Sequence, residues 1–201
     1  FDDQTKRGRN VIRQDQGAAP LSNAALSLPL KDYHGKIVTL ADFRGKPLVV
    51  NSWVAWCPFC RKELPDFAIV QEEFGDQVVI VAIDRAEPLE TAKRYSDELG
   101  VTGELLLLLD PSDSFYETIG GFSMPETIFV GKDGSTVFHK RGPMDVDEIR
   151  EHCEVRADRK DQPAPLDGPL AAGPVTRDRD PARIIEQDRR HQQPHVKRVP
   201  P

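Results

Sequence analysis

Two cysteines at the junction between a predicted strand and a predicted helix constrain this chain more than any other feature. Residues 48–53 form a continuous β-rich run, Leu-Val-Val-Asn-Ser-Trp, that is typical of a buried strand. Residues 58–74 place apolar side chains at helical spacing with charged side chains between them, and Gly75 ends the pattern. Cys57 and Cys60 therefore lie at the start of a helix, on one face of it. Their spacing allows them to form a disulfide with each other.

The position of each sulfur predicts its part in thiol-disulfide exchange. Cys57 falls at the helix cap, where unpaired N–H groups and the helix dipole stabilise a thiolate, the nucleophile of such exchange. Cys60 lies one turn into the helix and is more shielded, so it is expected to act as the resolving thiol. Pro58 suits the first turn because its missing N–H has no partner there. We therefore expect a redox-active disulfide, Cys57–Cys60, and no other cofactor.

A structural disulfide and half of a metal site are the alternatives for the same pair. A zinc site needs about four ligands, typically as two such pairs. Besides this pair the chain offers only Cys153 and five scattered histidines, and His191 and His195 lie near its end. No metal is expected on these grounds. Cys153 is expected to be a small buried side chain on the last helix, with a further redox role as the alternative.

The predicted elements alternate along the chain, which indicates an α/β sandwich with a mixed sheet. The early strands are continuous apolar runs, as in parallel strands joined by helices, whereas the turn at 132–134 predicts an antiparallel hairpin. The expected elements are a first hairpin (27–30 and 36–40), the strand and helix at the cysteines, a strand (78–83), a helix (88–99), a strand (105–109), a short helix (112–119), a second hairpin (127–130 and 135–138) and a last helix that contains Cys153.

Composition divides the 201 residues into three parts. Averaged over the chain, apolar residues make up 38%, which is low for a folded domain. Residues 156–201 contain no Phe, Trp or Tyr and 8 of the 17 prolines, which predicts a disordered tail rich in proline and charge. Residues 1–20 are polar and predict a disordered linker, so residues 21–155 form one domain. That domain holds 13 Lys and Arg against 23 Asp and Glu, an acidic balance that argues against a nucleic-acid partner.

Four motifs within residues 25–154 point to a known family. They are the run from Trp56 to Pro65 (Trp-Cys-Pro-Phe-Cys-Arg-Lys-Glu-Leu-Pro), the Gly-Lys-strand segment before it, the added helix and strand at 88–109, and Met-Pro-Glu-Thr at 124–127 before a strand. With these motifs the chain resembles thioredoxin-like proteins of the TlpA/ResA type, in the redoxin family. The resemblance implies a thioredoxin fold, a three-layer α/β/α sandwich with an N-terminal β-hairpin and an added helix-strand insertion.

The resemblance also implies an activity and a location. Proteins of this type are thiol:disulfide oxidoreductases of the bacterial envelope, outside the cytoplasm. The partners would be protein thiol or disulfide clients and an upstream thiol-disulfide electron donor, and the protein itself a monomer. Phe1 in place of Met is typical of a processed chain, so a membrane anchor before it is compatible with the sequence.

Several residue roles follow from the resemblance alone. Pro125 is expected to be a cis proline beside the dithiol that leaves the Met124 backbone open to pair with a client chain. Trp56 is expected to pack over the dithiol, and Phe59 to be an exposed apolar contact for clients. An ordinary trans proline and a plain core tryptophan are the alternatives. The expected substrate-binding residues are Trp56, Pro58, Phe59 and Met124; those expected in the core or at its rim are Phe122, Met124 and Phe129.

Two positions distinguish the chain from plain thioredoxin. Thioredoxin has a buried Asp six residues before its first cysteine, where this chain has Asn51, which cannot transfer protons. Proteins of the ResA type have a Glu three residues after the second cysteine, and Glu63 occupies that place. Glu63 is expected to act as base for Cys60 or to raise the thiol pKa values; a solvated helix residue is the alternative. The Pro-Phe pair between the cysteines lacks a His, which favours a reductant over a strong oxidant.

Two other function classes share some of these features. Peroxidases of the redoxin/AhpC-TSA group need a Thr three residues before the reactive cysteine, where this chain has Val54. A non-enzymatic module that handles thiols or copper would use a CxxxC-type pair and a His near Met124, and the chain has neither. Thiol-disulfide exchange on proteins is therefore the predicted function.

Overall fold

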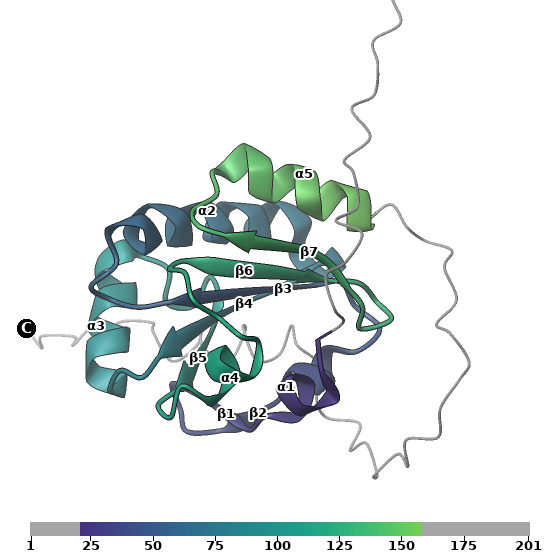
Figure 1. Cartoon of the computed structure of the whole chain (residues 1–201). Coiled ribbons are helices and arrows are strands. Elements are labelled where there is room, and N and C mark those ends of the chain that lie inside the picture. The colour runs from purple at the N-terminus through teal and green to yellow at the C-terminus, as the bar shows by residue number, and fades with distance from the viewer. Residues whose placement is uncertain (1–20, 158–201) are drawn as a thin grey trace, which may run out of the picture.

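The computed structural model describes the backbone of residues 21–157 and the side chains of residues 21–154. The linker expected at 1–20 and nearly all of the tail expected from residue 156 lie outside the described residues. Within them the chain forms a single sheet with helices on both faces (Figure 1). No helix in this part of the chain is long and apolar enough to cross a membrane.

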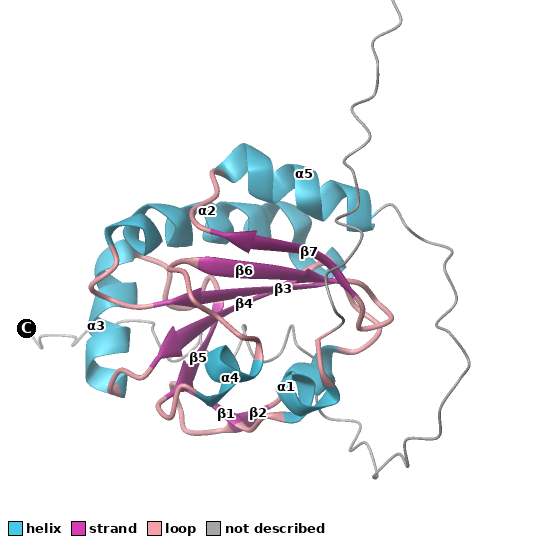
Figure 2. Cartoon of the chain, viewed as in Figure 1, coloured by secondary structure: helices cyan, strands magenta, loops and turns pink. Residues whose placement is uncertain are grey.

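The sheet is mixed, and its strand order in the described chain is β2-β1-β5-β4-β3-β6-β7 (Figure 2). Strands β3, β4 and β5 run parallel at the centre, and β6 and β1 join them antiparallel on either side. This is the mixed sheet that the sequence predicts. The strands are β1 (Leu30–Asp32), β2 (Ile37–Val38), β3 (Leu48–Trp53), β4 (Val79–Arg85), β5 (Leu106–Asp110), β6 (Glu126–Val130) and β7 (Thr136–Arg141).

Helices cover both faces of the sheet. One face carries α2 (Pro58–Phe74), α3 (Leu89–Leu99) and α5 (Val146–Ala157); the other carries α1 (Asn23–Ser27) and α4 (Ser114–Thr118). Two short 3-10 helices, η1 (Leu40–Phe43) and η2 (Gly75–Gln77), complete the described elements. Arg150 of α5 donates two hydrogen bonds of 2.8 Å to the carboxylate of Glu73, which ties α5 to α2.

Side chains of the central strand β3 enter both apolar layers of the core. Val49 and Trp53 pack into the layer under α2 and α3, while Leu48 and Val50 pack into the opposite layer. Because both faces are covered, every residue of β3 is buried, which explains its continuous apolar sequence. The chain leaves β3 at Trp53 and enters α2 within a few residues. The cysteines therefore lie at the end of the central strands where β3 and β4 end and β6 begins.

The first elements differ from the sequence prediction. The strand expected at 27–30 begins only at Leu30, because residues 23–27 form helix α1. Ser22 begins that helix, since its hydroxyl accepts the N–H of Ala25 at 3.1 Å. The strand expected at 36–40 shortens to β2, because Thr39 caps η1 and donates its N–H to the Asp42 carboxylate at 2.9 Å.

Candidate active site

The two cysteines occupy the first turn of α2, as their spacing predicts. Cys57 is the N-cap residue, and its sulfur accepts the backbone N–H of Cys60 at 3.2 Å. Pro58 follows as the first helical residue. Both cysteines are free thiols, and their exposed fractions are only 2% and 1%. The dithiol is therefore part of the apolar layer under α2.

Burial has a strong effect on the second thiol of the pair, Cys60. It raises the pKa of the Cys60 thiol well above its ordinary value, and the hydrogen bond with Cys57 raises it further. The charge of Glu63 acts in the same direction but more weakly. Cys60 therefore stays protonated at neutral pH and needs a base before it can attack a mixed disulfide.

Glu63 lies one helical turn beyond Cys60 and is 1% exposed, so the alternative of a solvated helix residue is wrong. Its Oε1 accepts a hydrogen bond from the Thr127 hydroxyl at 3.3 Å and one from the Asn51 amide at 3.4 Å. Its Oε2 has no partner among the described residues. Burial raises the pKa of Glu63 to about 8, against the opposing effect of the Thr127 hydrogen bond. The carboxyl can therefore hold or release a proton near neutral pH.

The segment before β6 brings a third part of the chain to the same edge of the sheet. The peptide bond between Met124 and Pro125 is cis. The next residue, Glu126, pairs with Ser52 at the end of β3. Met124 is half-buried and packs against the apolar cluster that contains both cysteines. The fold therefore brings the Met-Pro segment to the same end of the sheet as the first turns of α2, which carry the dithiol and Glu63.

Comparison with known proteins agrees with this geometry. The family model named Redoxin matches residues 16–153, which is more than half of the chain. The chain belongs to the Redoxin family. This redoxin is similar to the thiol-disulfide oxidoreductase ResA of Geobacillus thermodenitrificans, with 26% identity over 141 residues that cover 70% of this chain and 80% of the relative. It is also similar to the thiol:disulfide interchange protein DsbE of Pseudomonas aeruginosa, with 33% identity over 110 residues that cover 55% of this chain and 59% of the relative.

Solved structures show the same fold. A secreted disulfide oxidoreductase of Mycobacterium tuberculosis superimposes with a TM-score of 0.61 at 20% identity, covering 67% of this chain and 99% of that chain. The exposed lipoprotein thioredoxin Etrx1 of Streptococcus pneumoniae gives 0.55 at 29% identity, covering 64% and 98%. With its family and its Cys57–Cys60 pair, this redoxin is a thiol-disulfide oxidoreductase with a thioredoxin fold.

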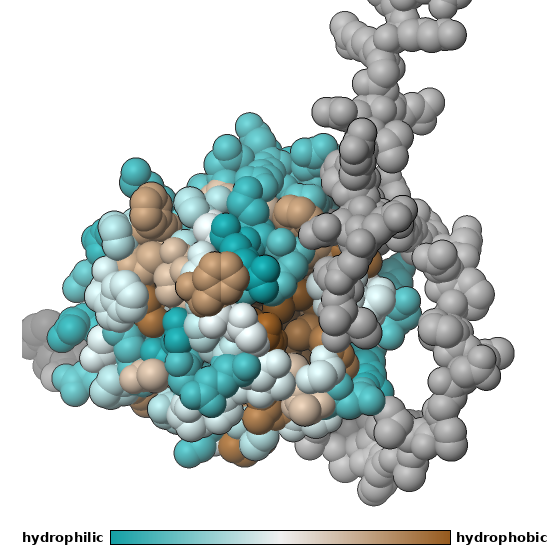
Figure 3. Space-filling model, viewed as in Figure 1, coloured by the Kyte–Doolittle hydropathy of each residue, from teal (hydrophilic) through white to brown (hydrophobic). Residues whose placement is uncertain are grey.

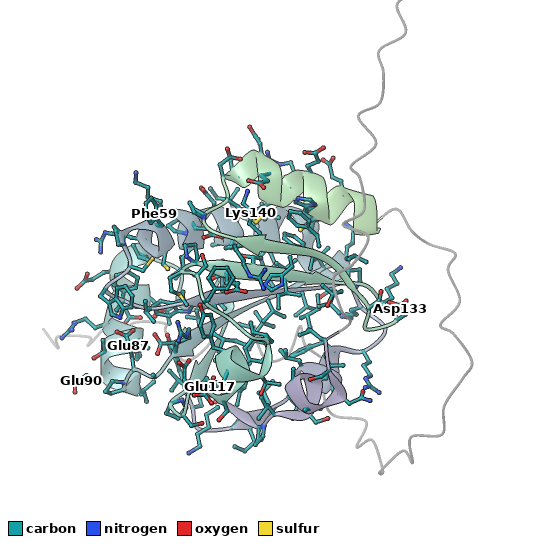
Figure 4. The ribbon with its side chains drawn as sticks, in the orientation of Figure 1. Phe59, Glu87, Glu90, Glu117, Asp133 and Lys140 are labelled. Atoms are coloured by element: carbon teal, nitrogen blue, oxygen red, sulfur yellow. The ribbon has the colours of Figure 1, made fainter. Side chains whose placement is uncertain are left out.

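Among the side chains that the structure describes, three aromatic ones are exposed. Trp56 is 72% exposed, Phe59 52% and Phe122 76%. Trp56 is therefore neither a core tryptophan nor a closely packed cover over the dithiol; the buried tryptophan is Trp53, which stacks on Tyr95. Phe122 is not in the core or at its rim, because the segment before Pro125 turns its ring outward. Space-filling Figure 3 shows brown apolar side chains standing out from a largely hydrophilic face, and Figure 4 labels Phe59 at the start of α2.

The sequence did not reveal how the segment carrying Phe122 is held. Glu126, fully buried, accepts the backbone N–H groups of Phe122 and Ser123 at 3.2 and 3.4 Å. Its other oxygen lies 2.6 Å from Nε2 of His139 and accepts Nε of Arg141 at 3.3 Å. The Arg141 guanidinium also lies 4.7 Å from the centre of the Phe122 ring. Burial raises the pKa of Glu126, but the hydrogen bond and charge of His139 outweigh it and leave that pKa lowered.

The remaining cysteine lies apart from this site. Cys153 is fully buried on α5, in the core layer expected for it. In the part of the chain that the structure describes, no group of three or more His, Cys, Asp or Glu side chains is placed to hold a metal ion. Val54, three residues before Cys57, is buried and offers no hydroxyl to a peroxide.

Proposed function

We propose that this redoxin reduces disulfide bonds in protein clients, with Cys57 as the attacking sulfur and Glu63 as the base for Cys60. The observation that carries the proposal is the buried Glu63 carboxyl, one turn from Cys60, whose pKa of about 8 lets it exchange a proton at physiological pH. Asn51 takes no proton here. Its amide instead helps to orient the Glu63 carboxyl.

The reaction proceeds through two exchanges. The Cys57 thiolate attacks one sulfur of a client disulfide; a mixed disulfide forms, and the other client sulfur leaves as a thiolate that takes up a proton. Glu63 then removes the proton of Cys60, and the Cys60 thiolate attacks the Cys57 sulfur. The Cys57–Cys60 disulfide forms, and the second client thiolate leaves and is protonated. Two electrons have passed from the dithiol to the client, and an upstream thiol-disulfide donor restores the dithiol.

The electrostatics of the dithiol support a reductant. A strongly oxidising dithiol has a reduced form stabilised as a thiolate. Here burial raises the pKa of Cys60, and the residues between the cysteines, Pro58 and Phe59, carry no charge. The reduced dithiol therefore has little extra stability over the disulfide form, so the pair gives up its electrons readily.

The exposed aromatics supply a surface for clients. Trp56 comes directly before Cys57, Pro58 and Phe59 lie between the cysteines, and Phe122 belongs to the segment that ends at Met124. We assign to this surface an extended client segment with apolar side chains around its cysteine. Such a segment can pair with the Met124 backbone while its side chains contact the aromatic rings. A client of this kind is an incompletely folded protein.

We place this activity outside the cytoplasm, in the bacterial envelope. The support is the kind of relative found, among them a secreted oxidoreductase and an exposed lipoprotein thioredoxin. The partners are then protein clients and an envelope thiol-disulfide donor, and the protein acts as a monomer.

Insulin reduction tests the proposal. Wild-type protein with a small dithiol as electron source should reduce insulin disulfides, and Cys57→Ser should abolish the reaction. Hydrogen peroxide consumption, measured in parallel, should stay at background because Val54 replaces the required Thr. Full insulin reduction by Cys57→Ser, or peroxide consumption faster than insulin reduction, would overturn the proposal.

A further inference from the structure

Asp84 is a buried acid that the reaction above does not use. It lies at the end of β4, is fully buried, and sits in register with Trp53 at the end of β3. No side-chain donor reaches either of its oxygens among the described residues. A buried carboxylate without donors is strongly disfavoured, so Asp84 needs a proton or a proton donor.

Glu87 is the group that faces Asp84. Burial first, and then a hydrogen bond to the Glu87 carboxyl, raise the pKa of Asp84 to about 9. Since both side chains are acids, that hydrogen bond forms only when one of them carries a proton. Asp84 is the more buried of the two and holds it, which satisfies an oxygen that is otherwise unpartnered. Asp84 thus keeps its proton at neutral pH and can donate it to the Glu87 carboxyl.

An unusual turn points Glu87 back toward the active-site loop. Ala86, between the two acids in sequence, has a φ of 54°, in the left-handed region that residues with a side chain rarely adopt. The N–H of Ala86 donates to the Asp110 carbonyl at 2.9 Å, which fixes the turn. Glu87 Oε2 then accepts the backbone N–H of Ala55 at 2.7 Å. Figure 4 labels Glu87 and Phe59 at the same end of the molecule.

Ala55 belongs to the short loop that positions the nucleophile. It follows Val54, whose carbonyl accepts the N–H of Cys57 at 3.2 Å, and precedes the exposed Trp56. The Ala55 hydrogen bond to Glu87 joins this loop to the end of β4. Loss of that bond would free the loop on one side while α2 holds it on the other.

We propose that Asp84 and Glu87 share one proton and act together as positioning residues, holding the loop 54–56 so that Cys57 is ready to attack. The proposal rests on the assignment of Cys57 as the attacking sulfur. Neither acid touches the reacting atoms; Glu87 acts through the Ala55 N–H, and Asp84 acts through Glu87.

The shared proton predicts a change at alkaline pH. When Asp84 loses it, two adjacent carboxylates repel each other and Glu87 leaves the Ala55 N–H. Other ionisable groups lie on the elements around β4. Those on the same side of the sheet are Cys57 and Cys60, Arg61 on α2, and Tyr95 on α3, whose pKa burial raises to about 12; Asp110 lies on neighbouring β5, in register with Arg85.

NMR of the isotope-labelled full chain reports the proposed contact through the chemical shift of the Ala55 amide. We expect this signal to move with pH in one transition near pH 9 in the wild type, and equally in Cys57→Ser, where the attacking thiol is absent. Asp84→Asn should keep the neutral-pH signal and lack the transition, because its amide donates to Glu87 without an ionisable proton. Glu87→Ala should show the unbonded signal at every pH.

Thiol reactivity supplies the second measurement. The rate of attack on a small aromatic disulfide at pH 7 should be about tenfold lower in Glu87→Ala and unchanged in Glu90→Ala, the matched control at an exposed acid on α3. A transition that persists in Asp84→Asn, or an unchanged Ala55 signal in Glu87→Ala, would overturn the proposal. Full insulin reduction by Cys57→Ser with the amide results intact would instead contradict only the assignment of the nucleophile.

Discussion

Replacing Glu63 with Gln distinguishes two effects of this buried acid: its effect on the free energy of unfolding and its role as a base in the reaction. The substitution keeps the volume of the side chain and an oxygen that accepts the hydrogen bond of the Thr127 hydroxyl. It removes the carboxylate that can accept the proton of the Cys60 thiol. We expect a protein that folds normally, attacks client disulfides at the wild-type rate and resolves the mixed disulfide slowly.

The pKa of Glu63 sets the magnitude and sign of the stability change. In the folded protein the pKa is raised from 4.5 to about 8, so the folded state binds this proton more tightly than the unfolded state. Stability from this group is present in full below pH 4.5 and is lost as the pH rises to about 8. The whole loss is at most about 5 kcal/mol, and we expect about half of it because proteins relax around buried charges.

Two assays test this reasoning. In urea unfolding of the reduced protein, the free energy of unfolding of Glu63→Gln relative to the wild type should rise by about 2 kcal/mol from pH 5 to pH 8. Glu72→Gln, at an exposed acid on the same helix, should show no such rise. Rapid-mixing kinetics at pH 8 should show mixed-disulfide resolution slowed about a hundredfold. An identical pH dependence of resolution in wild type and Glu63→Gln would refute the role of Glu63 as base.

Three further predictions concern the client surface and the dithiol. Phe122→Ser should raise the KM for insulin or another protein disulfide by about fivefold and leave attack on a small disulfide unchanged, since only a polypeptide client is long enough to contact the ring. Ile69→Ser, at an exposed apolar position on α2, should change neither. Glu126→Gln should lower the free energy of unfolding in urea by about 2 kcal/mol, because an amide nitrogen replaces one of the two carboxylate oxygens and leaves some of the hydrogen-bond donors around it without an acceptor; a change below about 0.5 kcal/mol would contradict this. Cys60→Ser should accumulate a mixed disulfide with a client, visible on non-reducing gels, and its absence would exclude Cys60 as the resolving thiol.

Local pattern was enough to predict the framework of the site. The apolar run of β3, the helical spacing after Pro58 and the stop at Gly75 each depend on neighbours in sequence, and they place Cys57 at the helix cap. Helix α1 escaped prediction because its five residues make little more than one turn, too few to show a period.

The chemistry of the site depends on contacts between distant residues, which a local pattern does not contain. Glu63 is buried because Thr127, 64 residues away, and Asn51 come together beside it. In sequence it stands next to Arg61 and Lys62, which made a solvated position equally reasonable. Phe122 follows the same logic: an aromatic residue is usually buried, but Glu126 holds its backbone in a segment that turns the ring outward.

The reduction potential of the Cys57–Cys60 pair tests the central claim most directly. It is obtained by equilibrating the protein with defined thiol-disulfide buffers and quantifying the free thiols of the pair, with Cys153 replaced by Ala to keep the count unambiguous. A reductant of client disulfides should give a value near about −270 mV, as for thioredoxin. A value near about −120 mV would make the protein a strong oxidant and would contradict the proposed direction of electron flow.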